Sequence, residues 1–417
     1  MKKHAKIFFM AVVISLGLSA AVSAQAVEPA ALTLAQCQAL AAQKNSDLKI
    51  QAEKRYQAEQ QLKQAQGDMM PDIRYELSQS RQNSISDTPK YTTSKFTLSQ
   101  PLFYGFKKVK TVSLSKSAVK QQELLYEAAQ RNLKADVSTA FYTLVQVETD
   151  LKDIQDSHDL LQNRLKELDD RVQLGKSRES EVLVVQSQLG VLLAQEESAE
   201  NDRQAALETL AFLTGLKAED LTVTDDNAAL GNMDPVEKYL EAAKNRPDLE
   251  ALRQEIVTQN YQVKIARGDY WPAVDLDTNW FTGNSDRPEN VTWQAAVSLD
   301  FPLFQGGITQ ARVNGELSRL REANEILVLL TDQVNTDIRK LYKALLSSIA
   351  QVETLKDAYA KANKSYQLQL KDYRYGLVNN LDVLQSLTTL LDGKRSLDRA
   401  LMQVKINKAL LDIAAMQ

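Results

Sequence analysis

Glycine, proline and aromatic residues are scarce in this 417-residue chain. It contains 14 Gly and 9 Pro, and Phe, Trp and Tyr together make up 6% of the residues. Such a composition is typical of long helices with few turns. The apolar content of 44% excludes a mostly disordered chain.

Cysteine and histidine are almost absent. Cys37 is the one cysteine, and His158 is the one histidine beyond the first residues of the chain. This excludes internal disulfides, zinc clusters and a Ser-His or Cys-His pair at a recognisable spacing. The formal net charge is −4 at pH 7, which argues against a nucleic-acid partner. We therefore expect no cofactor, no metal site and no enzymatic activity.

Long hydrophobic runs are missing except at the N-terminus. Lys2, Lys3 and Lys6 precede an apolar stretch at 7–22, and small residues suited to cleavage follow at Ala24 and Ala26. The pattern predicts a signal peptide at 1–24 and an exported protein. A retained anchor helix is the alternative, but the stretch is shorter than the ~20 residues of a bilayer span. No later run reaches that length, so we expect no membrane-crossing helix.

The chain contains an internal repeat with a constant displacement of 201 residues and no insertion. Since Gly and Pro mark turns and element ends, their recurrence means that the fold unit itself recurs. The repeat predicts two structural units, at 25–230 and 231–417. The matches are Asp47-Leu48 with Asp248-Leu249, Gly67-Asp68 with Gly268-Asp269, Pro71 with Pro272, Pro101-Leu102-Phe103 with Pro302-Leu303-Phe304, Gly105 with Gly306, Gly175 with Gly376, and Val182-Leu183 with Val383-Leu384.

Each unit is predicted to open with a helical segment, at 33–66 and 235–267, followed by two strands. Apolar and polar residues alternate in the strands, and the loops between them, 80–90 and 282–290, are rich in turn-forming residues. The apolar positions are Ile73, Tyr75, Leu77, Phe96 and Leu98 in the first unit, and Val274, Leu276, Trp280, Val291, Trp293, Ala295, Val297, Leu299 and Phe301 in the second.

The amphipathic strands permit two interpretations. One is a small sheet packed on helices. The other is a transmembrane β-barrel segment, which the strand length of roughly 9–11 residues favours. All three tryptophans, Trp271, Trp280 and Trp293, lie in or beside the second pair of strands, where an interfacial girdle would place them.

A very long helix is predicted after the first strand pair, because 107–174 contains neither Gly nor Pro. At ~1.5 Å per residue it would extend on the order of 100 Å. Gly175, and Gly376 in the second unit, are predicted to reverse the chain into antiparallel helical hairpins. Apolar residues spaced by three and four predict coiled-coil seams. Their members are Leu151, Ile154, His158, Leu161, Leu165, Leu168 and Val172, then Val182, Val185, Leu189 and Leu192, and in the second unit Leu397, Leu401, Val404 and Leu411.

Four strands cannot close a barrel, and an open sheet edge is not tolerated in lipid. Other copies of the chain must therefore complete it. A dimer would reach eight strands, but only larger barrels leave an aqueous lumen, so a homotrimer with a 12-stranded barrel is favoured. The fold class is thus mainly α with a membrane β-barrel: four β-strands per protomer and a long antiparallel coiled-coil α-barrel.

Each unit has the order helix, strand, loop, strand and long helical hairpin. This order, repeated twice, resembles the TolC-like outer-membrane efflux protein family (outer membrane factors). The strand ends Ser99-Gln100-Pro101-Leu102-Phe103 and Asp300-Phe301-Pro302-Leu303-Phe304 are its most specific marks. The resemblance implies a homotrimeric channel in the outer membrane of a Gram-negative bacterium, in contact with outer-membrane lipid and extending into the periplasm. It also implies a periplasmic adaptor protein and an inner-membrane pump of the RND or ABC type as partners, in a tripartite efflux or type I secretion system.

The resemblance also implies functional residues. Adaptor contacts would lie at the hairpin tips: Leu174, Gly175, Lys176, Tyr375, Gly376 and Leu377. A periplasmic gate would use Asp382 as an aperture acid, with Glu181, next to Ser180, as closed-state hydrogen-bond partner of Tyr373.

Two further observations bear on this gate. Glu181 and Asp382 are again 201 residues apart, and their alternative role is that of ordinary acids at helix N-termini. Val378 and Gln385 stand where the family often has an arginine and a second aperture acid. We therefore expect a gate with fewer polar locks.

Two other classes of protein compete with the channel. A periplasmic coiled-coil adaptor (membrane fusion protein) also has helical hairpins, but usually a single one inserted in a Gly-rich β-domain. An exported enzyme would need a clustered acid, base, nucleophile or metal ligand set, and the sequence offers none.

Overall fold

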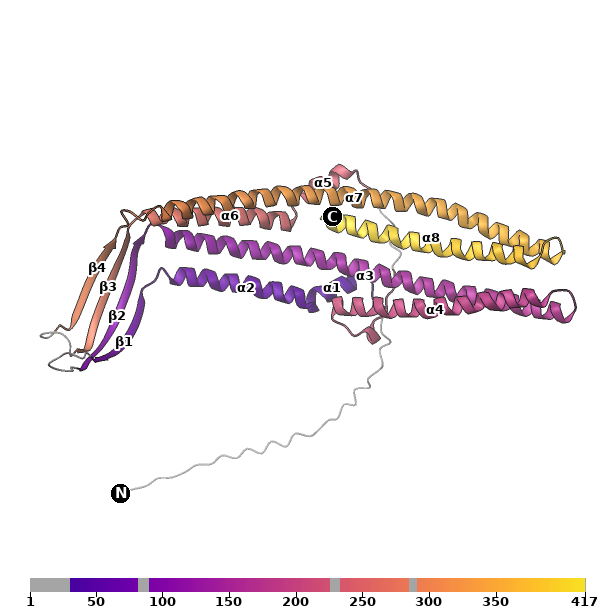
Figure 1. Ribbon diagram of the computed structural model, residues 1–417, viewed down its shortest axis with the longest axis horizontal. Helices are drawn as coiled ribbons and strands as arrows, with labels where there is room; N and C mark the ends of the chain where they lie inside the picture. Colours follow the sequence, from indigo (N-terminus) through magenta and orange to yellow (C-terminus); the bar gives the residue numbers. More distant parts are fainter. Residues whose placement is uncertain (1–30, 82–89, 226–232, 285–290, 417) are drawn as a thin grey trace, which may run out of the picture.

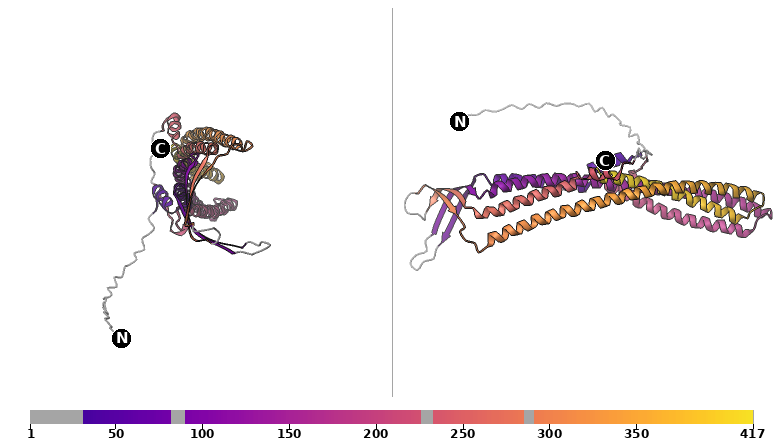
Figure 2. Two further views of the ribbon diagram at one scale, coloured as in Figure 1. Left: turned by 90° about the vertical axis from the view of Figure 1, so that its left-hand side faces the viewer. Right: turned by 90° about the horizontal axis from the view of Figure 1, so that it is seen from above.

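The computed structural model describes residues 31–81, 90–225, 233–284 and 291–416 (Figure 1). The predicted signal peptide at 1–24 lies outside these residues, as do 82–89 and 285–290 of the predicted loops. The protomer is elongated, with a small sheet at one end and the turns of the two helical hairpins at the other (Figure 1). The view from above shows the same rod-like shape, and the end-on view shows its narrow cross-section (Figure 2).

The two halves of the chain contain the same series of α-helices and strands, and differ in the place of a short 3-10 helix. The first has α1 (Leu34–Lys44), α2 (Ser46–Gly67), β1 (Asp72–Arg81), β2 (Lys90–Tyr104), α3 (Lys107–Gln173), α4 (Glu179–Thr214) and the short 3-10 helix η1 (Ala218–Asp220). The second has α5 (Val236–Ala243), α6 (Pro247–Arg267), the 3-10 helix η2 (Gly268–Tyr270), β3 (Ala273–Asn284), β4 (Trp293–Asp300), α7 (Ile308–Arg374) and α8 (Asn380–Ala414).

The opening helical segment of each half is broken into two helices, where the sequence predicted one. Asn45 ends α1 and caps α2, because its side chain accepts hydrogen bonds from the N–H groups of Asp47 and Leu48. Asn is favoured at such a cap, since its oxygen satisfies N–H groups that have no partner within the helix. In the second half the break precedes Pro247, which occupies the first turn of α6, where proline is tolerated.

The long helices agree with the prediction. Both α3 and α7 have 67 residues, so each extends on the order of 100 Å. The chain reverses after each of them at a glycine with positive φ, +68° at Gly175 and +71° at Gly376. Next to the sheet, α2, α3, α6 and α7 lie side by side in that order, whereas toward the turns the order is α4, α3, α8, α7.

The four strands form one antiparallel sheet in the order β1-β2-β3-β4. The two hairpins are joined because β2 pairs with β3. Beside this junction, Gly105 has a φ of +58°, and a Cβ built on it would lie 2.3 Å from the carbonyl oxygen of Gly268. The close approach of these two turns therefore requires glycine at position 105.

The two halves differ where each second strand ends. β2 continues through Pro101 to Tyr104, but β4 ends at Asp300, so Phe301 lies outside it. β4 also begins at Trp293, two residues later than predicted from Val291. The difference follows from position: the end of β2 is paired with β3, whereas β4 is an edge strand of the protomer.

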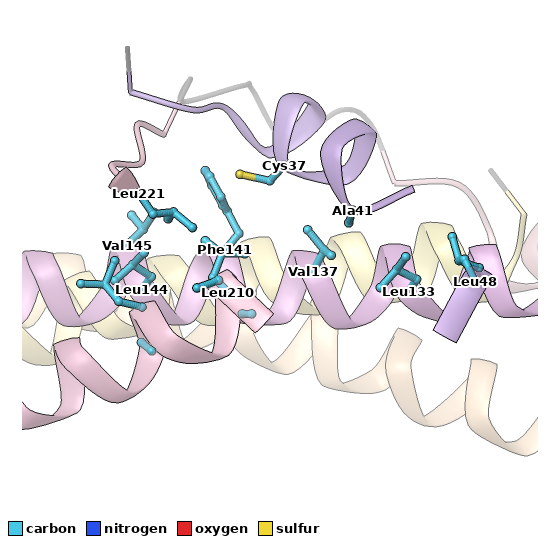
Figure 3. Packing of buried hydrophobic residues seen from close by; sticks show 14 residues of the cluster. Cys37, Ala41, Leu48, Leu133, Val137, Phe141, Leu144, Val145, Leu210 and Leu221 are labelled. Atoms are coloured by element: carbon cyan, nitrogen blue, oxygen red, sulfur yellow. The ribbon is translucent and has the colours of Figure 1, made fainter. Parts of the chain in front are cut away.

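Hydrophobic clusters are spaced along the rod. In the middle, α1 packs on α3 and α4 through Cys37, Ala41, Phe141 and Leu210 (Figure 3). Cys37 is fully buried as a free thiol, and this burial raises its pKa to about 11. The thiol is therefore a packing group, and it is not reactive.

The predicted seam of the first hairpin is largely confirmed. Leu151, Ile154, Leu161 and Leu168 are buried, as are the four predicted residues of α4. His158 is an exception, because its imidazole is 27% exposed and faces Gln162, 3.4 Å away. In the second hairpin Val404 and Leu411 are buried, but Leu401 is 36% exposed in the protomer, so its assignment to the seam was wrong.

An ion-pair network ties the two halves together near the start of α6. Asp248 accepts from Arg246, at 2.6 Å, and from Arg131 of α3, at 3.1 Å. Burial opposes ionisation of this carboxyl, but the two guanidinium groups outweigh it and lower the pKa of Asp248 to about 2.

None of the helices in the described ranges combines the length and apolar character of a bilayer span.

Candidate functional site

The sheet has one apolar face and one polar face. On the apolar face, a row of aromatic residues crosses all four strands, with Tyr75 opposite Phe96, Phe96 opposite Trp280, and Trp280 opposite Trp293. The rings of Tyr75 and Phe96 are 4.9 Å apart between centroids. Most of these side chains are half or more exposed in the protomer, so this face has apolar surface to present to lipid.

Hydrogen bonds across the strands organise the polar face. Lys95 pairs with Glu76 at 3.1 Å. One row away, Thr97 donates to Asn279 at 2.8 Å. Beyond it Ser99 donates to Asp277 at 2.5 Å. This face can line water, because its charged and polar groups satisfy one another and remain accessible.

The three predicted girdle residues lie at two levels. Trp280 and Trp293 are partners near the loop end of the sheet, and they are 61% and 59% exposed. Trp271 lies at the helix end, where its ring meets Phe103 and Phe106 edge-on with centroids 6.5 and 6.3 Å away. A girdle at each membrane surface would need aromatic residues at both levels; the girdle stays a prediction.

The predicted adaptor contacts lie together at the far end of the molecule, on the two turns (Figure 1). Leu174 on the first turn is 68% exposed, and Tyr375 and Leu377 on the second are 72% and 73% exposed. Gly175, Lys176 and Gly376 are exposed as well. Apolar side chains so accessible are available for a partner protein.

Both predicted gate acids lie in the first turn of a helix in this protomer, and Asp382 takes part in a helix cap. Asn379 and Asp382 form a reciprocal cap at the start of α8: the Asn379 side chain accepts from the N–H of Asp382, and the Asp382 carboxylate accepts from the N–H of Asn379. Glu181, in the first turn of α4, accepts from the hydroxyl of Ser177 at 2.7 Å, and Ser180 is exposed. A role for these acids at an aperture stays a prediction, and so does the closed-state bond between Tyr373 and Glu181.

Tyr373 is buried, with 6% exposure, and its contacts involve two arginines that sequence analysis missed. The guanidinium of Arg164, on α3, lies 4.1 Å from the centre of the Tyr373 ring, and that of Arg171 lies 4.4 Å away. Arg164 also donates twice to the side-chain oxygen of Asn380, at 3.0 and 2.6 Å, and once to Glu167, at 2.7 Å. We name Arg164, Arg171, Tyr373 and Asn380 the arginine clamp.

The arginine clamp joins the two helical hairpins close to their tips. Tyr373 lies in the last turn of α7 and Asn380 begins α8, so Arg164 holds both arms of the second hairpin against the first. The signal for it was present in the sequence: Arg164 stands three residues after Leu161 and four before Leu168, on the apolar face of α3. An arginine at such a position needs a buried acceptor, and only the fold shows that this is Asn380.

Comparison with known proteins agrees with this geometry. A family model described as "Outer membrane efflux protein" matches residues 38–216 and 239–415, which is most of the chain. The chain belongs to this family. Both matched stretches contain a strand pair and a helical hairpin of the structure.

Similar proteins are found among curated and solved members. The outer membrane protein TolC of Escherichia coli is 24% identical over 388 residues, covering 87% of this chain and 78% of TolC. The cation efflux system protein CusC of Escherichia coli is 21% identical over 385 residues, covering 85% and 79%. The crystal structure of the CmeC outer membrane channel of Campylobacter jejuni superimposes with a TM-score of 0.82 at 20% identity, covering 92% of this chain and 85% of CmeC.

Membership confirms the predicted function class and location. The chain is an efflux channel protein of the outer membrane, and its long helices extend into the periplasm. The alternative of a periplasmic adaptor has no support among these matches.

Proposed function

We propose that three copies of this chain form the exit duct of a tripartite efflux or type I secretion system. The duct conducts substrates passively from an inner-membrane pump to the cell exterior, without catalytic activity. One observation carries the proposal: an amphipathic four-stranded sheet continues directly into helical hairpins on the order of 100 Å long. Each repeat unit, 25–230 and 231–417, contributes one strand pair and one helical hairpin.

The trimer is supported by the free edges of the sheet. Among the described strands, β1 pairs with β2 alone and β4 with β3 alone. Unpaired edges are not stable in lipid, whereas β4 of one copy beside β1 of the next closes a 12-stranded barrel with an aqueous lumen. The apolar face would then meet outer-membrane lipid, and the polar face would line the lumen.

The adaptor is proposed to dock at the exposed tips, with Leu174, Tyr375 and Leu377 as apolar contacts. The pump would be of the RND or ABC type, as the family resemblance implies. A polar conduit leaves selection of the cargo to the pump. Cations are one candidate cargo, since the related CusC is named as a cation efflux system protein.

The gate is proposed to lie at the narrow periplasmic end. Glu181 and Asp382 would contribute six carboxylates in a trimer, and their repulsion favours cations. The arginine clamp would hold the second hairpin in place beside this ring, since it links both arms of that hairpin to α3.

Mass measurement of the purified protein in detergent tests the assembly, and we expect a trimer from the outer-membrane fraction. Its orientation is tested with single cysteines at Ser84, which lies outside the described residues, and at Asn284. Both should react with an impermeant thiol reagent on intact cells, while a cysteine at Leu174 should react only after permeabilisation. A monomer that stays soluble without detergent would refute the duct.

A further inference from the structure

Salt bridges cross the interface between α3 of the first hairpin and α8 of the second, midway between the arginine clamp and the centre of the rod. We call this interface the α3–α8 seam. Asp150 pairs with Arg399 at 3.0 Å, and Asp153 pairs with Lys394 at 2.7 Å. Lys394 also reaches Asp156 at 3.1 Å. These contacts join the outgoing helix of the first hairpin to the returning helix of the second.

One carboxylate oxygen in this seam lacks a donor. Asp153 is buried, with 5% exposure, and its Oδ1 takes the bond from Lys394. Its Oδ2 is buried and has no hydrogen-bond partner among the described residues. Asp398, one turn beyond Lys394 on α8, is half-buried and lies within hydrogen-bonding reach of Asp153. A buried acceptor without a donor is unfavourable, and a proton on Asp398 would supply the donor.

We propose that Asp153 and Asp398 share a proton, and that this carboxyl pair holds the two hairpins together in acidic surroundings and loosens their seam as the pH rises toward neutrality. The proposal goes beyond the duct function, because it concerns how one protomer holds its own hairpins. It stands whether or not the assembly conducts as proposed.

The surroundings support proton sharing. Burial, followed by the negative charge of Asp153 and a hydrogen bond to it, raises the pKa of Asp398 to about 6. Burial also raises the pKa of Asp150, although Arg399 opposes this. Burial alone would lower the pKa of Lys394, but its hydrogen bonds to Asp153 and Asp156 raise it overall, so the lysine stays charged.

The groups around the pair come from four helices. They are Asp150, Asp153 and Asp156 of α3, Gln195 of α4, Tyr359 of α7, and Lys394, Arg395 and Arg399 of α8.

The direction of the pH effect follows from the raised pKa. The paired state holds the proton more tightly than the separated state, in which Asp398 would have its ordinary pKa of about 4. The stabilisation is therefore fully present below pH ~4 and is lost as the pH rises through about 6. Between pH 5 and pH 7 the equilibrium constant for local separation should increase about tenfold.

Hydrogen–deuterium exchange on the intact protein tests the pair. Exchange of the 150–157 and 393–400 amides is compared between the parent chain and Asp398→Asn at the same pH, so that intrinsic exchange rates cancel. Both chains carry His158→Gln, so that α3 contains no imidazole. We expect the ratio of parent to variant exchange rates to rise about tenfold from pH 5 to pH 7.

Two further variants complete the test. Asp392→Asn removes an exposed acid from the same helix and should keep the pH response of the parent. Asp153→Asn should abolish the response, and it serves if Asp398→Asn does not assemble. A parent-to-variant ratio that does not change with pH, or a parent response that survives both Asp398→Asn and Asp153→Asn, would overturn the proposal.

Discussion

The role of the arginine clamp can be tested with substitutions, because Tyr373 can be made to lose either its whole ring or only its hydroxyl. Arg164→Met removes two charge-assisted hydrogen bonds from the buried oxygen of Asn380 and one cation from the face of Tyr373. Such hydrogen bonds contribute about 1.5–3 kcal/mol and a desolvated cation–π contact up to about 2 kcal/mol. We therefore expect the held position of the second hairpin to lose about 3–5 kcal/mol relative to a released one.

A loss of this size is large for a gate. At about 1.4 kcal/mol per factor of ten, it shifts the ratio of held to released hairpins by at least a hundredfold. Single-channel recording in planar bilayers measures this as the fraction of time spent in a high-conductance state. Arg164→Met and Tyr373→Leu should both increase that fraction, because both remove the stacking of guanidinium on ring.

Tyr373→Phe is the matched control. It keeps the ring between Arg164 and Arg171 but lacks the hydroxyl that the predicted bond to Glu181 requires. Recordings of Tyr373→Phe should therefore resemble those of the parent chain. If Tyr373→Phe opens the channel as much as Arg164→Met does, the hydroxyl holds the gate, and our reasoning from the clamp is wrong.

Three further predictions concern charge, pH and backbone geometry. Glu181→Gln combined with Asp382→Asn should reduce cation preference in bilayer recordings; unchanged selectivity would mean that these acids only cap helices. Asp248→Asn should lower the folding stability by ~2–3 kcal/mol near pH 7, as measured by thermal unfolding. In the parent chain, the stabilisation that Asp248 provides should disappear as the pH falls from about 4 through about 2. Gly105→Ala should lower the yield of assembled protein far more than Gly306→Ala, since both glycines have positive φ but only at Gly105 would a Cβ collide with backbone; equal yields would contradict this.

The regular parts of the fold could be predicted from the sequence. The long helix at 107–174 needed only the absence of Gly and Pro, and the alternation around Trp280 and Trp293 placed both on the apolar face. These features depend on neighbours along the chain or on a simple period.

Features that depend on tertiary pairing were missed. The different ends of β2 and β4 follow from which strand lies beside them, although the sequences there are nearly the same. The partners of Arg164 and of Asp398 lie more than 200 residues away in the chain. Asp398 looked like an ordinary charged residue of a helix surface, and the position of Arg164 on the apolar face of α3 did not reveal its partner, since only packing shows which groups meet.

The pairing of β2 with β3 has a consequence for assembly. Since the two hairpins of one chain are already joined, a closed ring of three copies has three chain-to-chain joints in its sheet, all of one head-to-tail kind. A chain with a damaged β4 edge and an intact β1 edge can still dock on a healthy neighbour, yet it leaves the circle unsealed. Mixed expression of healthy and edge-damaged chains should thus be dominant-negative, because a single faulty subunit disables the two healthy ones with it.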